Sequence, residues 1–580
     1  MGNFPNFLPP AAAAAELPVI LLLLAPLAAS IVSMCGKLIH KRAAVLPAFL
    51  VWSLGTGWAL FASAPAVFEG KSLLYALGGW AEPFGIVMEL NGASWAAGVT
   101  SLVLGTAIWL QTFGNRNYTS FFYSILYLTF FSLQGVLCTR DLFNLFVWFE
   151  ILSLCSFVLM AYDKEIESLT AALRYLFMST VSIIFFLLGL WIFYRYSGTL
   201  SLETIAAYLL EGDISRRAAG LATAAVAAGI LTRSAIIPFH TWLPYAHAAA
   251  PHPVSALLSG FVIKAPVFAL WHFTDYISFS GLGELLIWLG AGSAVVGGWG
   301  AAFQRDAKKV LAYSSIGQMG YIVAAFGIGG EIGKTAALYS IAAHALYKGL
   351  LFLVVGETTH RVGCRSVHTV RGLGRLFPFH TFMFALGAVS IMGIPLFAGY
   401  GAKHLLSISL YNHPAGLLVP VAGAGTAAAL FKLSRMFTGT PSEAIRIGYS
   451  KWNSGARLLE SPFRGSFVFP ATGLLVLASG CIVLGISPES VLGILLPLVE
   501  REDPAAFLTQ LSKIEWFALG GLLKTAGTIA AAALLYTFLQ LPPGRAVEAR
   551  LAEYRVSLNG SLRLLILGSL LFFLFGAFYY

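Results

Sequence analysis

Long apolar stretches, each long enough to cross a lipid bilayer, follow one another along almost the whole chain. A membrane-spanning helix needs about 20 mostly apolar residues. The predicted helices are 17–35, 43–62, 93–113, 119–138, 142–161, 168–194, 216–249, 253–275, 283–303, 308–328, 333–356, 379–411, 415–437, 467–487, 516–540 and 562–580. Only 11% of the residues are charged and 58% are hydrophobic, whereas a soluble protein has about 25% charged residues. The sequence therefore predicts an all-α polytopic membrane protein with about 16 transmembrane helices.

The basic residues predict how these helices are oriented. In a soluble protein a net charge of +10 would suggest binding to nucleic acid. Here most lysines and arginines stand beside helix ends, and they collect on one side when the helices alternate in direction. Cytoplasmic loops carry the excess of Lys and Arg. We therefore expect no nucleic-acid partner, a place in a prokaryotic cytoplasmic (inner) membrane, and both termini outside.

Two of the predicted helices are too long for one straight span, and each carries a proline in its middle. The stretch 216–249 is interrupted at Pro238, and the stretch 379–411 at Pro395. Proline removes an intrahelical hydrogen bond and clashes with the preceding turn. A pair of broken helices in corresponding halves is typical of the transport site in inverted-repeat transporters. The alternative is an ordinary proline kink.

Five ionisable side chains lie deep inside the predicted spans. They are Glu150, Arg233, Lys264, Lys348 and Lys403. A charge at the centre of a bilayer costs at least ~2.5–3.5 kcal/mol on insertion scales. Such charges are rarely kept for packing alone, and they mark ion paths or proton relays by default.

Four of these side chains and one histidine predict a proton relay: Glu150, Lys264, His344, Lys348 and Lys403. A buried lysine can exchange its proton near neutral pH, and a histidine does so readily. His344 and Lys348 are four residues apart and therefore share one face of a helix. Three alternatives stay open. Glu150 could form a fixed ion pair, Lys264 could extend to the membrane surface, and His344 with Lys348 could serve helix packing only.

Six further residues are candidates for a water access path: His240, His247, His252, Lys308, Lys309 and His404. The two neighbouring lysines are equally well explained as anchors at a helix start. The histidines have no HExxH spacing and no nearby set of carboxylates, and the five cysteines form no CxxC pair or cluster. We therefore predict neither a metal site nor a cofactor in this chain.

Segments around these residues resemble, in the same order, the proton-conducting antiporter-like family. That family includes the large membrane subunits of respiratory complex I, the two large subunits of Mrp-type sodium/proton antiporters, and membrane subunits of energy-converting hydrogenases and formate hydrogenlyase. The matching segments are 148–150, 234–244, 253–264, 306–321, 344–352 and 393–403. The resemblance implies two inverted five-helix halves, each with a broken helix. It divides the chain into N-terminal helices (1–115), a first half (116–280), a second half (281–440) and a C-terminal region of linker, extra helices and amphipathic segment (441–580).

The resemblance also implies residue roles. Glu150 matches the helix-five glutamate of the family, Lys264 and Lys348 match the central lysines, and Lys403 matches the terminal basic residue on the second broken helix. The family usually has lysine where this chain has Arg233, and many members carry an acid in place of His404. Arginine is not deprotonated in proteins. Arg233 is therefore expected to be a fixed counter-charge to Glu150, so the first half either relies on Glu150 alone or conducts weakly.

The function implied is ion translocation, with the proton as the favoured ion, by a subunit of a redox complex of the hydrogenase or complex I type. The segment 246–260 is most similar to the hydrogenase and formate hydrogenlyase branch. Iron–sulfur clusters and a metal or flavin active site would then lie in peripheral redox subunits, so this chain has no redox site of its own. Antiporter-like paralogues, small membrane subunits and lipid would surround it. The alternatives are a subunit of an Mrp-type sodium/proton antiporter and a non-conducting scaffold or coupling subunit.

Overall fold

The computed structural model is almost entirely helical. It describes residues 10–578, apart from 37, 39–43, 81, 83–84, 116, 278–280, 458–467, 496, 500–514 and 554–555. The helices up to residue 276 are α1 (Pro10–Gly36), α2 (Val45–Phe68), η1 (Leu77–Gly79), α3 (Gly92–Thr112), α4 (Ser120–Cys138), α5 (Leu142–Met160), α6 (Ile166–Ser197), α7 (Leu202–Glu211), α8 (Arg216–Arg233), η2 (Phe239–Trp242), α9 (Leu243–Ala249), α10 (His252–Leu257), η3 (Leu258–Val262) and α11 (Ala265–Tyr276). Those that follow are α12 (Leu282–Phe303), α13 (Ala307–Ile328), α14 (Gly330–Val362), α15 (Leu373–Leu376), α16 (Pro378–Met392), α17 (Ala398–Ser409), η4 (Pro414–Leu417), α18 (Leu418–Ser434), α19 (Glu443–Arg457), α20 (Val468–Ile486), α21 (Pro488–Leu495), α23 (Leu519–Gln540), α24 (Pro542–Glu553) and α25 (Leu558–Phe578).

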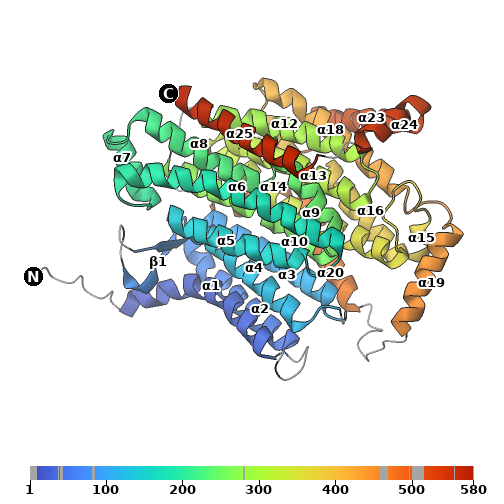
Figure 1. The fold of residues 1–580 in the computed structure, drawn as a ribbon, viewed down its shortest axis with the longest axis horizontal. Coiled ribbons are helices and arrows are strands. Elements are labelled where there is room, and N and C mark those ends of the chain that lie inside the picture. The colour runs from blue at the N-terminus through green and yellow to red at the C-terminus, as the bar shows by residue number, and fades with distance from the viewer. Residues whose placement is uncertain are drawn as a thin grey trace, which may run out of the picture.

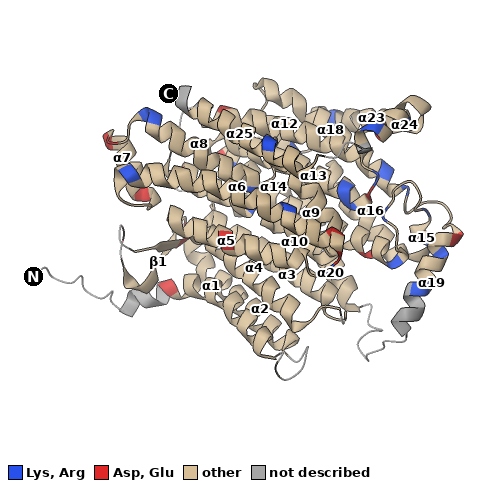
Figure 2. Cartoon of the chain, viewed as in Figure 1, with Lys and Arg blue, Asp and Glu red and all other residues tan. Residues whose placement is uncertain are grey.

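The long helices run side by side between two ends of the molecule (Figure 1). One end, called the hairpin end below, carries α7 and an antiparallel pair of strands that the sequence did not predict, β1 (Leu73–Ala76) and β2 (Val87–Leu90). The other end, called the basic end, carries α15, α19 and α24. Lysine and arginine gather towards the ends, and only a few charged residues lie along the middle of the bundle (Figure 2).

Thirteen helical segments of the described chain are long and apolar enough to cross a membrane. The other three stretches predicted from the sequence are helical as well. The stretch 216–249 contains α8, η2 and α9, the stretch 379–411 contains α16 and α17, and the stretch 562–580 overlaps α25. The all-α polytopic membrane fold is confirmed, whereas the count of sixteen spans stays a prediction.

Both proline breaks are present in the structure. After α8 the backbone leaves the helix and continues in η2, and the freed amide of Ile237 donates to Ser293 Oγ at 3.0 Å. At the second break Gly393 has a φ of 80°, a left-handed conformation that favours glycine. Polar backbone groups at membrane depth need partners, and side chains of neighbouring helices provide them here.

Two aspartates begin helices at opposite ends of the bundle. Asp141 caps α5 and Asp306 caps α13, each accepting a hydrogen bond from a backbone amide in the first turn. Each also forms an isolated β-bridge to the loop after the next helix, Asp141 to Ser201 and Asp306 to Ser366. An inverted duplication would place the same contacts in this way. The boundaries of the four predicted regions stay predictions.

The backbones of α12 and α13 touch along their length. A side-chain carbon at Gly297 would lie 2.2 Å from the amide nitrogen of Gly317, and one at Gly320 would lie 2.4 Å from the carbonyl oxygen of Gly290. Non-bonded carbon atoms do not approach so closely. Glycine is therefore required on both helices, and no side chain separates them at these positions.

The last three helices connect α18 to α6 and α8. α23 packs on α18, whereas α25 packs on α8 and α6. α24 joins them at the basic end, where Glu548 pairs with Lys432 of α18 at 3.0 Å. α25 covers the first break, since a side-chain carbon at Gly568 would lie 2.6 Å from Phe239.

Candidate functional site

The first candidate site joins α5 to the end of α8. Arg233 donates from Nη2 to Glu150 Oε1 at 2.9 Å. Its Nη1 donates to the carbonyl oxygen of Phe149 at 3.2 Å and to Ser153 Oγ. The Arg233 side chain is 6% exposed and the Glu150 side chain 39%. The guanidinium of the pair is therefore buried, whereas the carboxylate is partly exposed. The role of this pair in a relay stays a prediction.

A π-helical turn, η3, shapes the surroundings of Lys264. Within this turn the amides of Ile263 and Lys264 bond to carbonyls other than those of Ser259 and Gly260. Lys264 Nζ donates to both of these carbonyls, at 2.7 Å for Ser259. Lys264 is fully buried, so its ammonium does not extend to the membrane surface. Single π-turns of this kind are frequent at functional sites.

Lys348 and two histidines lie buried together in the bundle. Lys348 Nζ donates to the carbonyl oxygen of Leu311 at 2.7 Å and to Ser314 Oγ. His344 on α14 and His247 on α9 are fully buried, and neither ring has a hydrogen-bond partner among the described residues. A buried polar nitrogen without a partner costs about 1–3 kcal/mol. Such rings are suited to exchanging protons with internal water or with each other.

A row of neighbouring positions on α14 continues from these residues to the basic end. Positions 344, 348, 352, 356 and 360 repeat every four residues, so each neighbours the next, and the row winds around α14 by about 40° per step. Phe352 stacks on the His247 ring at 4.6 Å. Gly356 lies against His252, since a side-chain carbon there would be 2.3 Å from His252 Cβ, and the His360 ring is 6.1 Å from the His252 ring. The two access histidines thus lie between the buried centre and the exposed end of α14.

Of the other predicted access residues, some lie beside this row and others lie elsewhere. Lys308 Nζ donates to the carbonyl oxygen of Ala250 at 2.7 Å, in the turn between the two access histidines, and so lies beside this row. Lys309 Nζ instead lies 5.2 Å from the ring of Tyr245. The His240 ring instead lies 6.5 Å from the ring of Tyr313 on α13. The structure therefore brings together His247, His252 and Lys308, and leaves Lys309 and His240 apart.

Lys403 lies after the second break and its side chain reaches back across it. It lies on α17, and its Nζ donates to the carbonyl oxygens of Ile391 and Met392, the last of α16, both at 2.9 Å. Among the described residues no carboxylate forms an ion pair with it. His404 stacks on Tyr400 at 5.6 Å. A side-chain carbon at Gly521 of α23 would lie 3.3 Å from the His404 ring, so His404 belongs to the contact with α23, and the structure does not bring it to the access row.

Sequence reasoning missed Lys432, which is buried at the end of α18. Its Nζ donates to the carbonyl oxygens of Ala302 and Gln304 and to Glu548 Oε1. Glu548 is on α24, outside the spans. Burial alone would raise the pKa of Glu548, but the His368 hydrogen bond and the Lys432 charge together hold it below the ordinary value of 4.5. The available signal was that Lys432 lies within the apolar stretch 415–437.

The described residues contain no group of three His, Cys, Asp or Glu side chains that could hold a metal ion. The cysteines are all unpaired. The absence of a metal site or cofactor from this chain stays a prediction.

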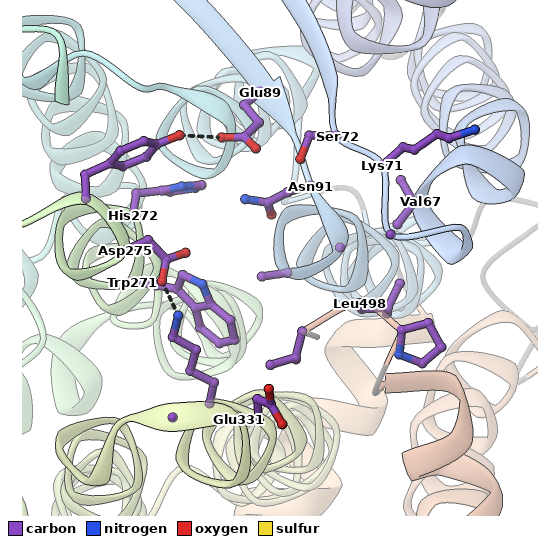
Figure 3. A pocket seen from close by; sticks show the side chains of 18 residues that line it. Val67, Lys71, Ser72, Glu89, Asn91, Trp271, His272, Asp275, Glu331 and Leu498 are labelled. Carbon is purple, nitrogen blue, oxygen red and sulfur yellow. Dashed lines mark hydrogen bonds and ion pairs between the residues drawn. The ribbon is translucent and has the colours of Figure 1, made fainter. Parts of the chain in front are cut away.

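A polar cavity of about 340 Å³ opens at the hairpin end. Side chains from β2, α11 and α14 face it (Figure 3). Among them Glu89 and His272 lie deep, and Asp275 pairs with Lys334 at the side. His272 stands about two turns along α11 from Lys264. The cavity therefore brings polar groups to the hairpin-end side of the central lysine.

A protein family described as the transmembrane part of NADH:quinone oxidoreductase and Mrp antiporters matches residues 139–427. NADH-quinone oxidoreductase subunit N of Desulforudis audaxviator is 30% identical over 447 residues, which cover 74% of this chain and 88% of that protein. The chain belongs to this antiporter-like family. A Na⁺/H⁺ antiporter subunit of Alkalihalophilus pseudofirmus is 26% identical, over 77% of this chain and 90% of its own length.

Solved structures agree with this membership in the antiporter-like family. A chain of the membrane-bound sulfane sulfur reductase, an archaeal respiratory membrane complex, is 25% identical with a TM-score of 0.71 and covers 90% of this chain and 100% of its own length. A chain of the Mrp complex from Dietzia sp. is 21% identical with a TM-score of 0.73, covering 86% and 98%. The second match shows the fold alone. The resemblance inferred from the sequence is confirmed.

Proposed function

We propose that this chain translocates ions, with the proton as the favoured ion, as a subunit of a redox complex of the hydrogenase or complex I type. The observation that carries the proposal is the buried group of Lys264, His344, Lys348 and His247. Among the described residues no carboxylate pairs with either lysine. Two unpaired ammonium groups in a low-dielectric interior are strongly disfavoured, so protons in this group are readily given up and passed on.

The geometry supports a path along α14. Protons enter at the basic end, pass His252 and His247, and reach Lys348 and Lys264 at the centre. Lys403 receives them at the second break. Arg233 keeps its charge throughout, so Glu150 is released only when it is protonated or when the two helices separate.

The charge distribution supports the placement of the basic end inside and the hairpin end outside, in a prokaryotic cytoplasmic membrane. The relatives are subunits of larger membrane assemblies, which supports other membrane subunits as partners. We further propose that peripheral redox subunits carry the iron–sulfur clusters and the metal or flavin active site, and that lipid covers the remaining apolar surface.

Two other functions have specific support. Relatives named as antiporter subunits, such as the one from Alkalihalophilus pseudofirmus at 26% identity, support a place in an Mrp-type sodium/proton antiporter. Arg233 supports a scaffold that no longer conducts, because the first half has lost a group that can release a proton.

Proton uptake into inverted membrane vesicles that contain the native complex tests the relay. Lys264→Ala and Lys348→Ala are expected to lower uptake by about tenfold or more, because each removes a proton-transfer group, while the driving reaction continues. Lys71→Ala is the control, since that side chain is 70% exposed at the hairpin end. Unchanged uptake in both central variants would exclude the relay and leave the scaffold.

Purification of the native complex separates the first two functions. Co-purifying hydrogenase or dehydrogenase subunits would support the redox complex, whereas small antiporter subunits and sodium-dependent proton movement would support the Mrp-type assembly.

A further inference from the structure

A buried carboxylate that is not part of the proposed relay lies near the basic end of α14. Glu357 has a side chain that is only 9% exposed. Its Oε2 accepts a hydrogen bond from His380 Nε2 on α16 at 3.2 Å and another from Gln111 Nε2 on α3. Its Oε1 pairs with Arg361. Donors from three helices therefore satisfy both oxygens, and such bonds favour the charged carboxylate.

Glu357 stands beside the outer end of the access row. It directly follows Gly356, which packs against His252, and its charge acts on the His252 imidazole. One turn further along α14, His360 is exposed at the surface. Glu357 thus bonds directly to His380 and lies one residue from the contact of α14 with His252.

The other charges around this point are mostly positive. Arg361 and His360 come from α14 itself, and Lys308 from α13 acts on His252 as well. Asp163, in the turn between α5 and α6, interacts mainly with Lys308. Tyr118, which precedes α4, also interacts electrostatically with Glu357. Without the carboxylate of Glu357, cations would surround the inner imidazoles and repel an arriving proton.

We propose that Glu357 collects protons at the basic end of the path. The proposal rests on the proposed translocation function. An imidazole of His252 or His380 takes a proton from solvent on a ring nitrogen and becomes an imidazolium near the carboxylate, and a proton taken by His380 moves on through water to His252, which leaves His380 neutral. His252 then passes a proton to His247 and returns to the neutral form. Glu357 keeps its own charge and acts as a positioning residue through the two histidines.

The alternative is that Glu357 has a purely structural role and acts as a clamp that holds α3, α14 and α16 together. A clamp and a collector differ in their dependence on pH. Loss of a clamp lowers uptake equally at every pH. Loss of a collector makes the imidazoles harder to protonate, so uptake falls at high pH and is retained at low pH.

The test is the rate of proton uptake by the native complex against the pH on the basic-end side. In Glu357→Gln the pH of half-maximal uptake should move by about one unit towards acid, the size expected for losing one close opposite charge. Uptake on the alkaline side should then fall by about tenfold. Glu357→Asp should restore most of the profile. If Glu357→Gln does not assemble, His380→Gln must move the profile in the same direction.

Glu548→Gln is the matched control. It removes another buried carboxylate at the basic end that contacts a histidine, but it lies on α24. Its profile should stay in place. An equal shift in this control would overturn the proposal that Glu357 collects protons. The same holds if Glu357→Gln shows no shift while Lys348→Ala abolishes uptake. Either result would leave the proposed translocation function in place. Full uptake in both Lys264→Ala and Lys348→Ala would instead overturn the proposed function.

Discussion

The two broken helices hold their cations in opposite ways. At the first break Arg233 ends α8, before the interruption, and binds the carboxylate of Glu150 at 2.9 Å. At the second break Lys403 follows the interruption and reaches back to the carbonyl oxygens of Ile391 and Met392. One cation has a charged partner on another helix, and the other donates its hydrogen bonds to neutral oxygens of its own broken helix.

This difference decides which break can exchange a proton. A guanidinium stays charged in proteins, so the first pair can change only if Glu150 is protonated or moves. An amine loses one of three hydrogens when it is deprotonated, and the remaining two can still bond to both carbonyls. The second break can therefore load and unload a proton without rearranging its backbone.

The largest effect is expected at the second break. Lys403→Arg keeps the positive charge but cannot release a proton, so uptake should fall by about a hundredfold, as when a general acid–base group is lost. Lys403→Ala should fall as far. Vesicle uptake measured at equal driving activity checks this, and a normal rate in Lys403→Arg would show that the second break only needs a fixed charge.

A smaller effect is expected at the first break. Arg233→Lys should retain or raise coupling, because lysine can both hold Glu150 and release a proton. Arg233→Ala should depress uptake by about tenfold at most, since the Glu150 side chain is 39% exposed and solvent weakens its attraction to the buried Arg233. The measurement is protons moved per turnover. Equal values in all three forms would place the first break outside the path.

Low pH should weaken the contact between α24 and α18 that the Glu548–Lys432 pair forms. The pKa of Glu548 lies below its ordinary value of 4.5, so its pair with Lys432 stabilises the fold fully above that pH. The contribution is lost as the pH falls through the lower folded-state pKa. The hydrogen-exchange protection factors of α24 amides in the solubilised complex should therefore fall on strong acidification. In Glu548→Gln these protection factors should already be low and should not change with pH.

The smallest effect is expected where α25 covers the first break. Gly568→Ala would place a carbon 2.6 Å from Phe239, and such overpacking costs about 1–3 kcal/mol. We expect a lower thermal midpoint with the second break unaffected. Gly527→Ala on α23 is the control, because nothing lies within 4 Å of that position. A midpoint equal to that of the control would mean that α25 does not rest on the break.

The apolar stretches and the prolines were predictable because both act locally. Each predicted span contains helix, and the interruptions fall at Pro238 and Pro395. Contacts between distant segments were not predictable. Lys432 finds its carboxylate on α24, more than a hundred residues later, and Glu357 takes its donors from α3 and α16. The π-turn, in which Lys264 Nζ caps the carbonyl oxygens of Ser259 and Gly260, was not predicted from the residue pattern.

The glycine contacts between α12 and α13 limit how this protein can move. Where the backbones of Gly297 and Gly317 meet, neither helix can rotate or tilt without driving main-chain atoms into each other. The two helices must therefore move together as one rigid body during any transport cycle. Displacement that accompanies transport should therefore occur at interfaces made of longer side chains, such as that between α14 and α16. The rigid pair of α12 and α13 should stay fixed while these interfaces move.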